Sequence, residues 1–334
     1  MSRVTPSLRM RPAAVTVDPC ARPFLPVLAC AVIIAILPQV WFGGSEYTTG
    51  LAVTALEFAA YAIGFNLIFG ATNQLFLCVG ALAGCGGYAA GILANRVSLP
   101  IWAAVVLGTL LAAAVGGVMS WISVRRSLGL IFTGIVTLAF SLAFQDLLSG
   151  AESLTGGSTG VEVTAAAVKL ADNRVGGFYL FGAAVVAFLI VFRLLQRSHV
   201  GWAFRALRDD ETAAALAGVD VARYRVYAAV IGSAMIGLTG ALYAYSDGFL
   251  SPPIFAFNEI DVTVLVLAAF GGLGTLLGPA IGATVFAFVD YSLTNSGQLR
   301  ELLYGLFVVA IFLGFREGVI QTIVKLAARF VRRR

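Results

Sequence analysis

The chain has 334 residues, of which 60% are hydrophobic and only 12% are charged, and its formal net charge is +5. Soluble domains have roughly 45–50% apolar and about 25% charged residues, so this composition excludes an ordinary soluble domain. Apolar runs of about 20 residues recur, and each is long enough to cross a bilayer as a helix. The runs do not alternate apolar and polar residues, which argues against a transmembrane barrel and leaves a bundle of helices.

Ten apolar segments are predicted to be transmembrane or re-entrant helices of an all-α polytopic membrane protein. The third and eighth are rich in glycine, so we expect them to be broken or re-entrant rather than full spans. This membrane domain covers residues 24–320, between a basic tail at 1–23 and another at 321–334. In chain order the segments are 24–42, 51–70, 75–94, 99–124, 128–149, 177–196, 224–246, 259–275, 278–296 and 302–318.

Lysine and arginine are distributed unevenly between the connections. With the N-terminus inside, 18 of the 22 basic residues lie on the cytoplasmic side, and only Arg96, Lys169, Arg174 and Arg300 lie outside. Cytoplasmic loops carry such an excess, so both termini and the loop 198–222 are predicted to be cytoplasmic. Because topology accounts for the positive charge, we expect no nucleic-acid partner.

The sequence offers no candidate catalytic or metal-binding group. The four cysteines lack metal or redox spacing, and His199, the only histidine, has no nearby ligands of the usual types. No GxSxG elbow surrounds a serine, and neither Lys169 nor Lys325 belongs to a GxxxxGK[ST] phosphate loop. If ATP drives this protein, another polypeptide must therefore bind it.

The loop 198–222 is densely charged and lies between two apolar segments. Asp210 is a candidate N-cap, Gly218 can end a helix, and Asp220 can cap the next membrane helix. A two-turn, alanine-rich helix of about 12 Å is predicted between these signals. This pattern favours a docking element for a soluble partner over a plain connection. Its candidate residues are Arg205, Arg208, Asp209, Asp210, Glu211, Ala213, Ala214, Gly218 and Asp220.

Several runs resemble the LivM-type branched-chain amino-acid permeases of ABC importers. ETAAALAG at 211–218 looks like the family's EAA coupling motif, and the longer run 197–225 is similar to its corresponding loop. The other matching runs are GFNLIFG at 64–70, GGY at 86–88, LTGGSTG at 154–160 and FGGLGTLLGPAIGA at 270–283. They follow the family's order over about residues 50–320. The sequence departs from the family after Gln74, where Ser and Gly are lost, and at Arg316-Glu317-Gly318, where Pro-x-Gly is usual.

The resemblance implies partners and a location. It implies a heterodimer with a sister permease in the bacterial inner membrane, two cytoplasmic ABC ATPases and a periplasmic solute-binding protein. ATP and magnesium would be bound by those ATPases, and this chain would hold no cofactor. The ATPases would move residues 208–220 as a lever, and the helix around Tyr224 to Tyr245 would switch the path between outward-open and inward-open.

Two glycine-rich regions interrupt apolar segments in the two halves of the chain. Paired broken segments point to an internal repeat with a translocation path at its interface, although close helix packing explains small residues equally well. Asn66, Asn73 and Gln74 either line this path or bridge helices. The candidate path residues are Glu57, Asn66, Asn73, Gln74, Gly86, Gly87, Gly271, Gly272 and Gly274.

Acidic residues within apolar segments are expensive to insert and therefore suggest function. Glu57 lies well inside the second segment and Asp290 deep in the ninth. Glu57 is either functional, or protonated or satisfied by a neighbouring helix. Another group of acidic and polar residues is predicted near the outer face. These residues either contact the ammonium group of a substrate or a binding protein, or they are solvated helix ends. They are Asp146, Asn258, Glu259 and Asp261.

The outer loop 150–176 is the longest outside connection. Its glycines make it pliable, and residues 161–168 are compatible with a short interfacial helix. The resemblance implies that this loop faces the binding protein; the alternative is an ordinary surface loop. The candidate docking residues are Thr155, Gly156, Gly157 and Gly160.

The function predicted from the resemblance is import of leucine, isoleucine and valine by the permease subunit of an ATP-driven transporter. A urea or short-amide permease of the same family is the nearest alternative. An ion-coupled secondary transporter, with Glu57 and Asp290 as ion sites, is an alternative of another class, and a non-transporting membrane anchor is a third.

Overall fold

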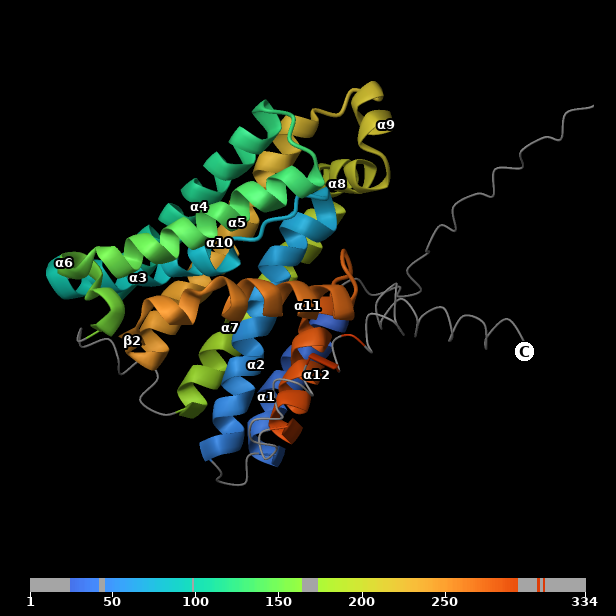
Figure 1. Ribbon diagram of the computed structural model, residues 1–334. Helices are drawn as coiled ribbons and strands as arrows, with labels where there is room; N and C mark the ends of the chain where they lie inside the picture. The colour runs from blue at the N-terminus through green and yellow to red at the C-terminus, as the bar shows by residue number, and fades with distance from the viewer. Residues whose placement is uncertain are drawn as a thin grey trace, which may run out of the picture.

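The computed structural model describes residues 25–41, 46–97, 99–163 and 174–293, together with 305, 306 and 309 (Figure 1). This part of the chain is a bundle of helices. The longer helices are α1 (Leu25–Trp41), α2 (Glu46–Phe65), α3 (Val79–Val97), α4 (Ile101–Arg125), α5 (Leu130–Gly150), α7 (Arg174–Arg197), α8 (His199–Asp209), α10 (Val221–Asp247), α11 (Val262–Gly271) and α12 (Gly278–Leu293). The shorter elements are η1 (Asn66–Gly70), α6 (Glu152–Thr155), η2 (Gly157–Thr159), β1 (Val161–Glu162), α9 (Glu211–Leu216), β2 (Phe249–Leu250), η4 (Pro252–Phe255) and η5 (Phe257–Asp261).

The predicted helical class is confirmed, but the count of ten spans is not. Within the described residues, five helices are long and apolar enough to cross a membrane: Thr48–Gly70, Ile101–Arg125, Leu130–Gly150, Val175–Arg197 and Val221–Asp247. Shorter apolar helices occupy Pro26–Ile36 and Gly278–Val289. The two predicted tails and almost all of the tenth segment lie outside the described residues.

Helix α10 is the centre of the bundle and packs against α2, α3 and α4 (Figure 1). Small residues allow these backbones to approach closely, as is usual in membrane helices. A methyl group added to Gly86 of α3 would overlap the backbone carbonyl of Gly237 in α10, and one added to Gly108 of α4 would overlap that of Gly86. Close packing therefore explains these glycines without reference to a path.

The third predicted segment is not broken at its glycines, which lie within the continuous helix α3; the interruption precedes them. Residues 73–78 are not helical, and α3 begins only at Val79. Side chains from distant elements satisfy the freed backbone: the Thr137 hydroxyl accepts from the Leu77 N–H (2.9 Å), and the Asp261 carboxyl group accepts from the N–H groups of Val79 and Gly80. Backbone at membrane depth needs such partners because no water replaces them.

The eighth predicted segment is also broken. Its π-helical start, η5, leads into α11, which has only ten residues and is followed by the loop 272–277. Asp261, at the junction, is 1% exposed and also accepts from the Ser141 hydroxyl (3.1 Å). For this residue, the interpretation as a solvated helix end is wrong, because the chain folds its carboxyl group over the start of α3.

The outer loop forms a compact turn that leads into a small antiparallel pair. Val161 pairs with Leu250 and Glu162 with Phe249, and the Val163 N–H donates to the Gly248 carbonyl (2.8 Å). The helix expected over residues 161–168 is therefore wrong at its start, because β2 offers a pairing edge that the local sequence does not reveal. Residues 164–168 lie outside the described part of the chain.

Candidate functional site: the α8–α9 segment and the broken segments

Two consecutive helices, here called the α8–α9 segment (residues 199–216), lie at one end of the bundle, and α6 lies at the other (Figure 1). Helix α8 buries Ala203, Phe204 and Leu207, whereas Trp202 is 67% exposed. This spacing of three and four residues is the signature of an amphipathic helix. Only the alanine-rich helix was predicted in this loop, although the apolar spacing of α8 in the sequence also indicates a helix.

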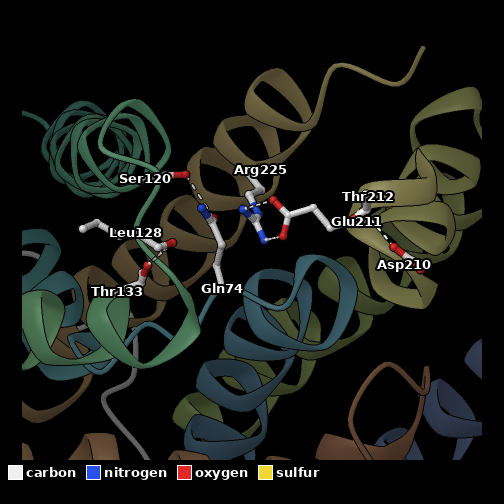
Figure 2. Close-up of polar contacts among 8 residues, drawn as sticks. All are labelled: Gln74, Ser120, Leu128, Thr133, Asp210, Glu211, Thr212 and Arg225. Carbon is white, nitrogen blue, oxygen red and sulfur yellow. Dashed lines mark hydrogen bonds and ion pairs between the residues drawn. The ribbon is translucent and has the colours of Figure 1, made fainter. Parts of the chain in front are cut away.

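The predicted caps of α9 are confirmed. The Asp210 carboxylate accepts from the N–H groups of Thr212 (2.8 Å) and Ala213 (3.0 Å) (Figure 2). Gly218 adopts a positive φ of 85°, a conformation that disfavours other residues. Asp220 accepts from the Arg223 N–H (3.1 Å) and thereby caps α10. The sequence thus fixes both the start and the end of this six-residue helix.

Glu211 contacts its own chain. Its two carboxylate oxygens each accept a 2.8 Å hydrogen bond from the guanidinium of Arg225, the two groups facing each other in Figure 2. Arg225 is on α10, and its side chain is 15% exposed. The pair therefore ties α9 to a membrane helix, and no signal in the sequence predicted Arg225 as the partner of Glu211.

The outward side of α9 is apolar. Ala213 is exposed, Ala214 is buried, and Leu216 is 86% exposed. Leu216 was not among the predicted docking residues, although it is the one large apolar residue in the alanine run. Arg205 and Asp209 are also exposed.

A cavity of about 620 Å³ lies beside α9, between the ends of several membrane helices. Its wall includes both members of the Glu211–Arg225 pair, the turn between α4 and α5, and Asn73. Gln74, one residue further, is buried and accepts from the Ser120 hydroxyl (3.1 Å) (Figure 2). Near it the Thr133 hydroxyl faces the Leu128 carbonyl at 3.5 Å.

The structure places some of the predicted path residues close to Arg208, which is one of the predicted docking residues. Asn66 donates to the Thr275 carbonyl and accepts from the Gly274 N–H, both in the loop 272–277. Arg208 donates to the Leu273 carbonyl of the same loop, and its backbone carbonyl accepts from the Asn73 side chain. Gly271 and Gly272 flank this contact, and a methyl group on Gly271 would overlap the Gly278 carbonyl. Gly86 and Gly87 lie elsewhere, packed against the backbone of α10. Their role in a path stays a prediction.

Glu57 borders a second cavity, of about 310 Å³, between α2, α7 and α10. Asp247 and Tyr243 share this cavity, and the Tyr243 hydroxyl donates to Asp247 (3.1 Å). Tyr61, one turn after Glu57 on α2, is fully buried. The side chain of Asp290 is outside the described part of the chain.

The four predicted outer docking residues form one turn. The Thr155 hydroxyl donates to the Leu148 carbonyl (2.6 Å) and accepts from the Gly157 N–H (3.3 Å). Gly156, Gly157 and Gly160 all have positive φ. Their conformation shapes the turn, and their role in docking stays a prediction.

Apolar spans, interrupted glycine-rich segments and a capped polar connection define a multi-pass helical protein of the permease class. Over residues 47–315 the chain matches the family described as the permease component of branched-chain amino acid transport systems, and it belongs to that family. It is therefore a transport subunit and a multi-pass inner-membrane protein. This family membership confirms the resemblance found in the sequence.

Curated relatives support the assignment and show its breadth. The high-affinity branched-chain amino acid transport system permease protein LivM of Escherichia coli is 27% identical over 81% of this chain and 72% of its own length. LivM of Salmonella typhimurium is 27% identical over 80% of this chain and 71% of its own. The fructose import permease protein FrcC of Rhizobium meliloti is 24% identical over 84% of this chain and 83% of its own. No solved structure matches the chain.

Proposed function

We propose that this chain is the permease subunit of an ATP-driven importer of leucine, isoleucine and valine. One structural observation carries the ATP-driven part: α9 is capped at both ends and presents an outward apolar side with Leu216 86% exposed. A large apolar side chain on a polar connection is suited to a pocket in a soluble partner, since burying a leucine contributes about 1.5–3 kcal/mol.

The proposed partners are a sister permease, two cytoplasmic ABC ATPases and a periplasmic binding protein, with ATP and magnesium held by the ATPases. Both termini and α9 would then face the cytoplasm, as the distribution of basic residues predicts. The outer turn around Gly156 would face the binding protein. Each ATPase cycle would displace the α8–α9 segment and, through Arg225, the helix α10.

The substrate is proposed from the two LivM relatives and the family's description. A sugar permease among the relatives means that the substrate needs a direct test. Urea and short amides are the nearest alternative class. In such importers specificity would lie mainly in the binding protein, so this chain would hold substrate weakly.

The test is uptake by proteoliposomes that contain this chain, its sister permease, the ATPases and the binding protein encoded with it. We expect ATP-dependent uptake of radiolabelled leucine and valine but not of fructose or urea. Uptake of fructose or urea alone would overturn the substrate. Uptake by this chain alone that is indifferent to ATP and abolished by an ionophore would overturn the mechanism and favour the ion-coupled alternative.

A further inference from the structure

The two broken segments are joined by one amide side chain. Asn66, at the start of η1, donates to the Thr275 carbonyl (2.9 Å) and accepts from the Gly274 N–H (2.6 Å). Asn66 is buried, and its partners lie more than 200 residues further along the chain. The Asn66 side chain therefore holds the break after α2 and the loop 272–277 after α11 directly together.

Arg208 connects this unit to α8. Its guanidinium donates to the Leu273 carbonyl (3.0 Å), and its own backbone carbonyl accepts from the Asn73 side chain (3.3 Å). Leu273 lies in the loop just after α11, and its carbonyl receives a charge-assisted hydrogen bond, which is stronger than one from a neutral donor. Arg208 thus holds one broken segment with its side chain and the other with its backbone.

The packing around these contacts leaves little freedom. Gly274 has a φ of +73°, and a methyl group there would overlap the Arg208 guanidinium. A methyl group on Gly70 would overlap both the Asn66 amide oxygen and the Gly274 nitrogen. The glycines therefore allow the guanidinium and the amide to reach the backbone of the loop.

We propose that Arg208 is the positioning residue that transmits movement of the α8–α9 segment to both broken segments. The proposal rests on the proposed function, because an ATPase must supply the movement. Glu211 and Arg225 attach the same segment to α10. One displacement would therefore reach α10 through the ion pair, and the two breaks through Arg208.

An arginine outside the α8–α9 segment provides the matched control. Arg125 is the last residue of α4, it is exposed, and its guanidinium lies over the Trp121 ring at 5.0 Å from the ring centroid. This contact is confined to α4. Removing the Arg125 guanidinium removes the same charge as removing that of Arg208, but leaves the contact with the broken segments intact.

The experiment compares Arg208→Met and Arg125→Met in the complete importer, reconstituted in proteoliposomes, with ATP hydrolysis and leucine uptake measured in the same vesicles. We expect Arg208→Met to keep its ATPases and to hydrolyse ATP, but to import about tenfold fewer leucine molecules per ATP. The reason is that it loses the hydrogen bond from the charged guanidinium to the Leu273 carbonyl and keeps only the backbone contact with Asn73. Arg125→Met should stay within about twofold of the wild type, since its contact is confined to α4.

Arg208→Lys tests whether a loss of uptake in Arg208→Met comes from a failure to fold. A lysine retains the charge and one reachable donor, so partial recovery of the leucine-to-ATP ratio is expected. A normal ratio in Arg208→Met, or an equal loss in both methionine variants, would overturn the linkage while leaving the proposed function in place. A wild-type complex that hydrolyses no ATP would overturn the proposed function and the linkage with it.

Discussion

The guanidinium of Arg225 and the carboxylate of Glu211 meet in two parallel hydrogen bonds of 2.8 Å each, across 14 residues of sequence. The Glu211 side chain is 51% exposed and that of Arg225 only 15%. Two parallel hydrogen bonds fix the relative orientation of the two side chains more tightly than an ordinary surface ion pair does. The glutamate of the ETAAALAG run therefore contacts a membrane helix of its own chain.

Reversing the charge of Glu211 should disable the protein by repulsion. Glu211→Arg places two guanidinium groups together, and we expect leucine uptake to fall at least about tenfold, because a tenfold change corresponds to 1.4 kcal/mol and like charges at this distance cost about that much. The double variant Glu211→Arg/Arg225→Glu restores the pair and should recover most of the uptake. If the double variant folds but still fails to retain the ATPases, Glu211 contacts the ATPase directly.

Leu216 should govern retention of the ATPase. Leu216→Asp exchanges an apolar side chain for a charge on the outward side of α9, and we expect the co-purified ATPase to fall about tenfold or more, since burial of a leucine contributes about 1.5–3 kcal/mol. Leu154→Asp makes the same exchange on α6, where the leucine is 50% exposed, and should leave the ATPase bound. Equal retention in both variants would remove α9 from the docking surface.

The Asp210 cap should matter through its acceptor oxygen and less through its charge. Asp210→Ala deletes both hydrogen bonds to the first turn of α9 and should weaken ATPase binding about fivefold, as expected for a cap worth about 1 kcal/mol. Asp210→Asn keeps an acceptor and should bind nearly as well as the wild type. The ATPase affinity of the three proteins, measured in detergent, separates these cases; identical weakening by Ala and Asn would instead point to the charge.

Gly274 should tolerate no side chain. Gly274→Ala forces a left-handed conformation on alanine, at about 1–2 kcal/mol, and also displaces the Arg208 guanidinium. We expect a lower thermal midpoint in detergent and a loss of coupling. Gly150→Ala is the control, because an added methyl group there meets nothing within 4 Å. A Gly274→Ala protein as stable and as well coupled as Gly150→Ala would contradict the structure at this loop.

Substitution of Glu57 distinguishes an ATP-driven importer from an ion-coupled transporter. In the ATP-driven importer Glu57→Gln keeps the size of the side chain and should change leucine uptake by less than about threefold, since no ion need bind there. In an ion-coupled transporter the same variant should abolish uptake. Thr54→Val, in the wall of the same cavity, controls for changes in its shape.

Local signals predicted α9 well and tertiary contacts poorly. Asp210, Gly218 and Asp220 act on backbone within three residues, so their roles could be predicted from the sequence. The contact of Arg208 with Leu273 joins residues 65 positions apart and depends on how α8 lies against the loop 272–277. Similarly, the partner of Asp261 is the start of α3, and only the packing of η5 against that helix reveals it.

The membrane segments show the same division. Composition established the helical class and located the second interruption, at Gly271, Gly272 and Gly274, but it misplaced the first, which lies at residues 73–78 before the glycines of α3. It did not establish the number of spans, since α11 is too short to cross by itself and 302–318 is largely outside the described residues. Gly86 illustrates the limit: its small size was evident, but only the structure shows that it accommodates Gly237.

The carboxyl group of Asp261 joins three elements at one buried point: its own junction between η5 and α11, the first residues of α3, and Ser141 on α5. We expect this junction, held by three hydrogen bonds, to act as a pivot. A tilt of α11 against α3 would then turn about Asp261, and the displacement would be largest at the opposite end of α11, in the loop 272–277 that Arg208 contacts. A small movement of α8 would thereby rotate α11 within the bundle while the first residues of α11 stay in place.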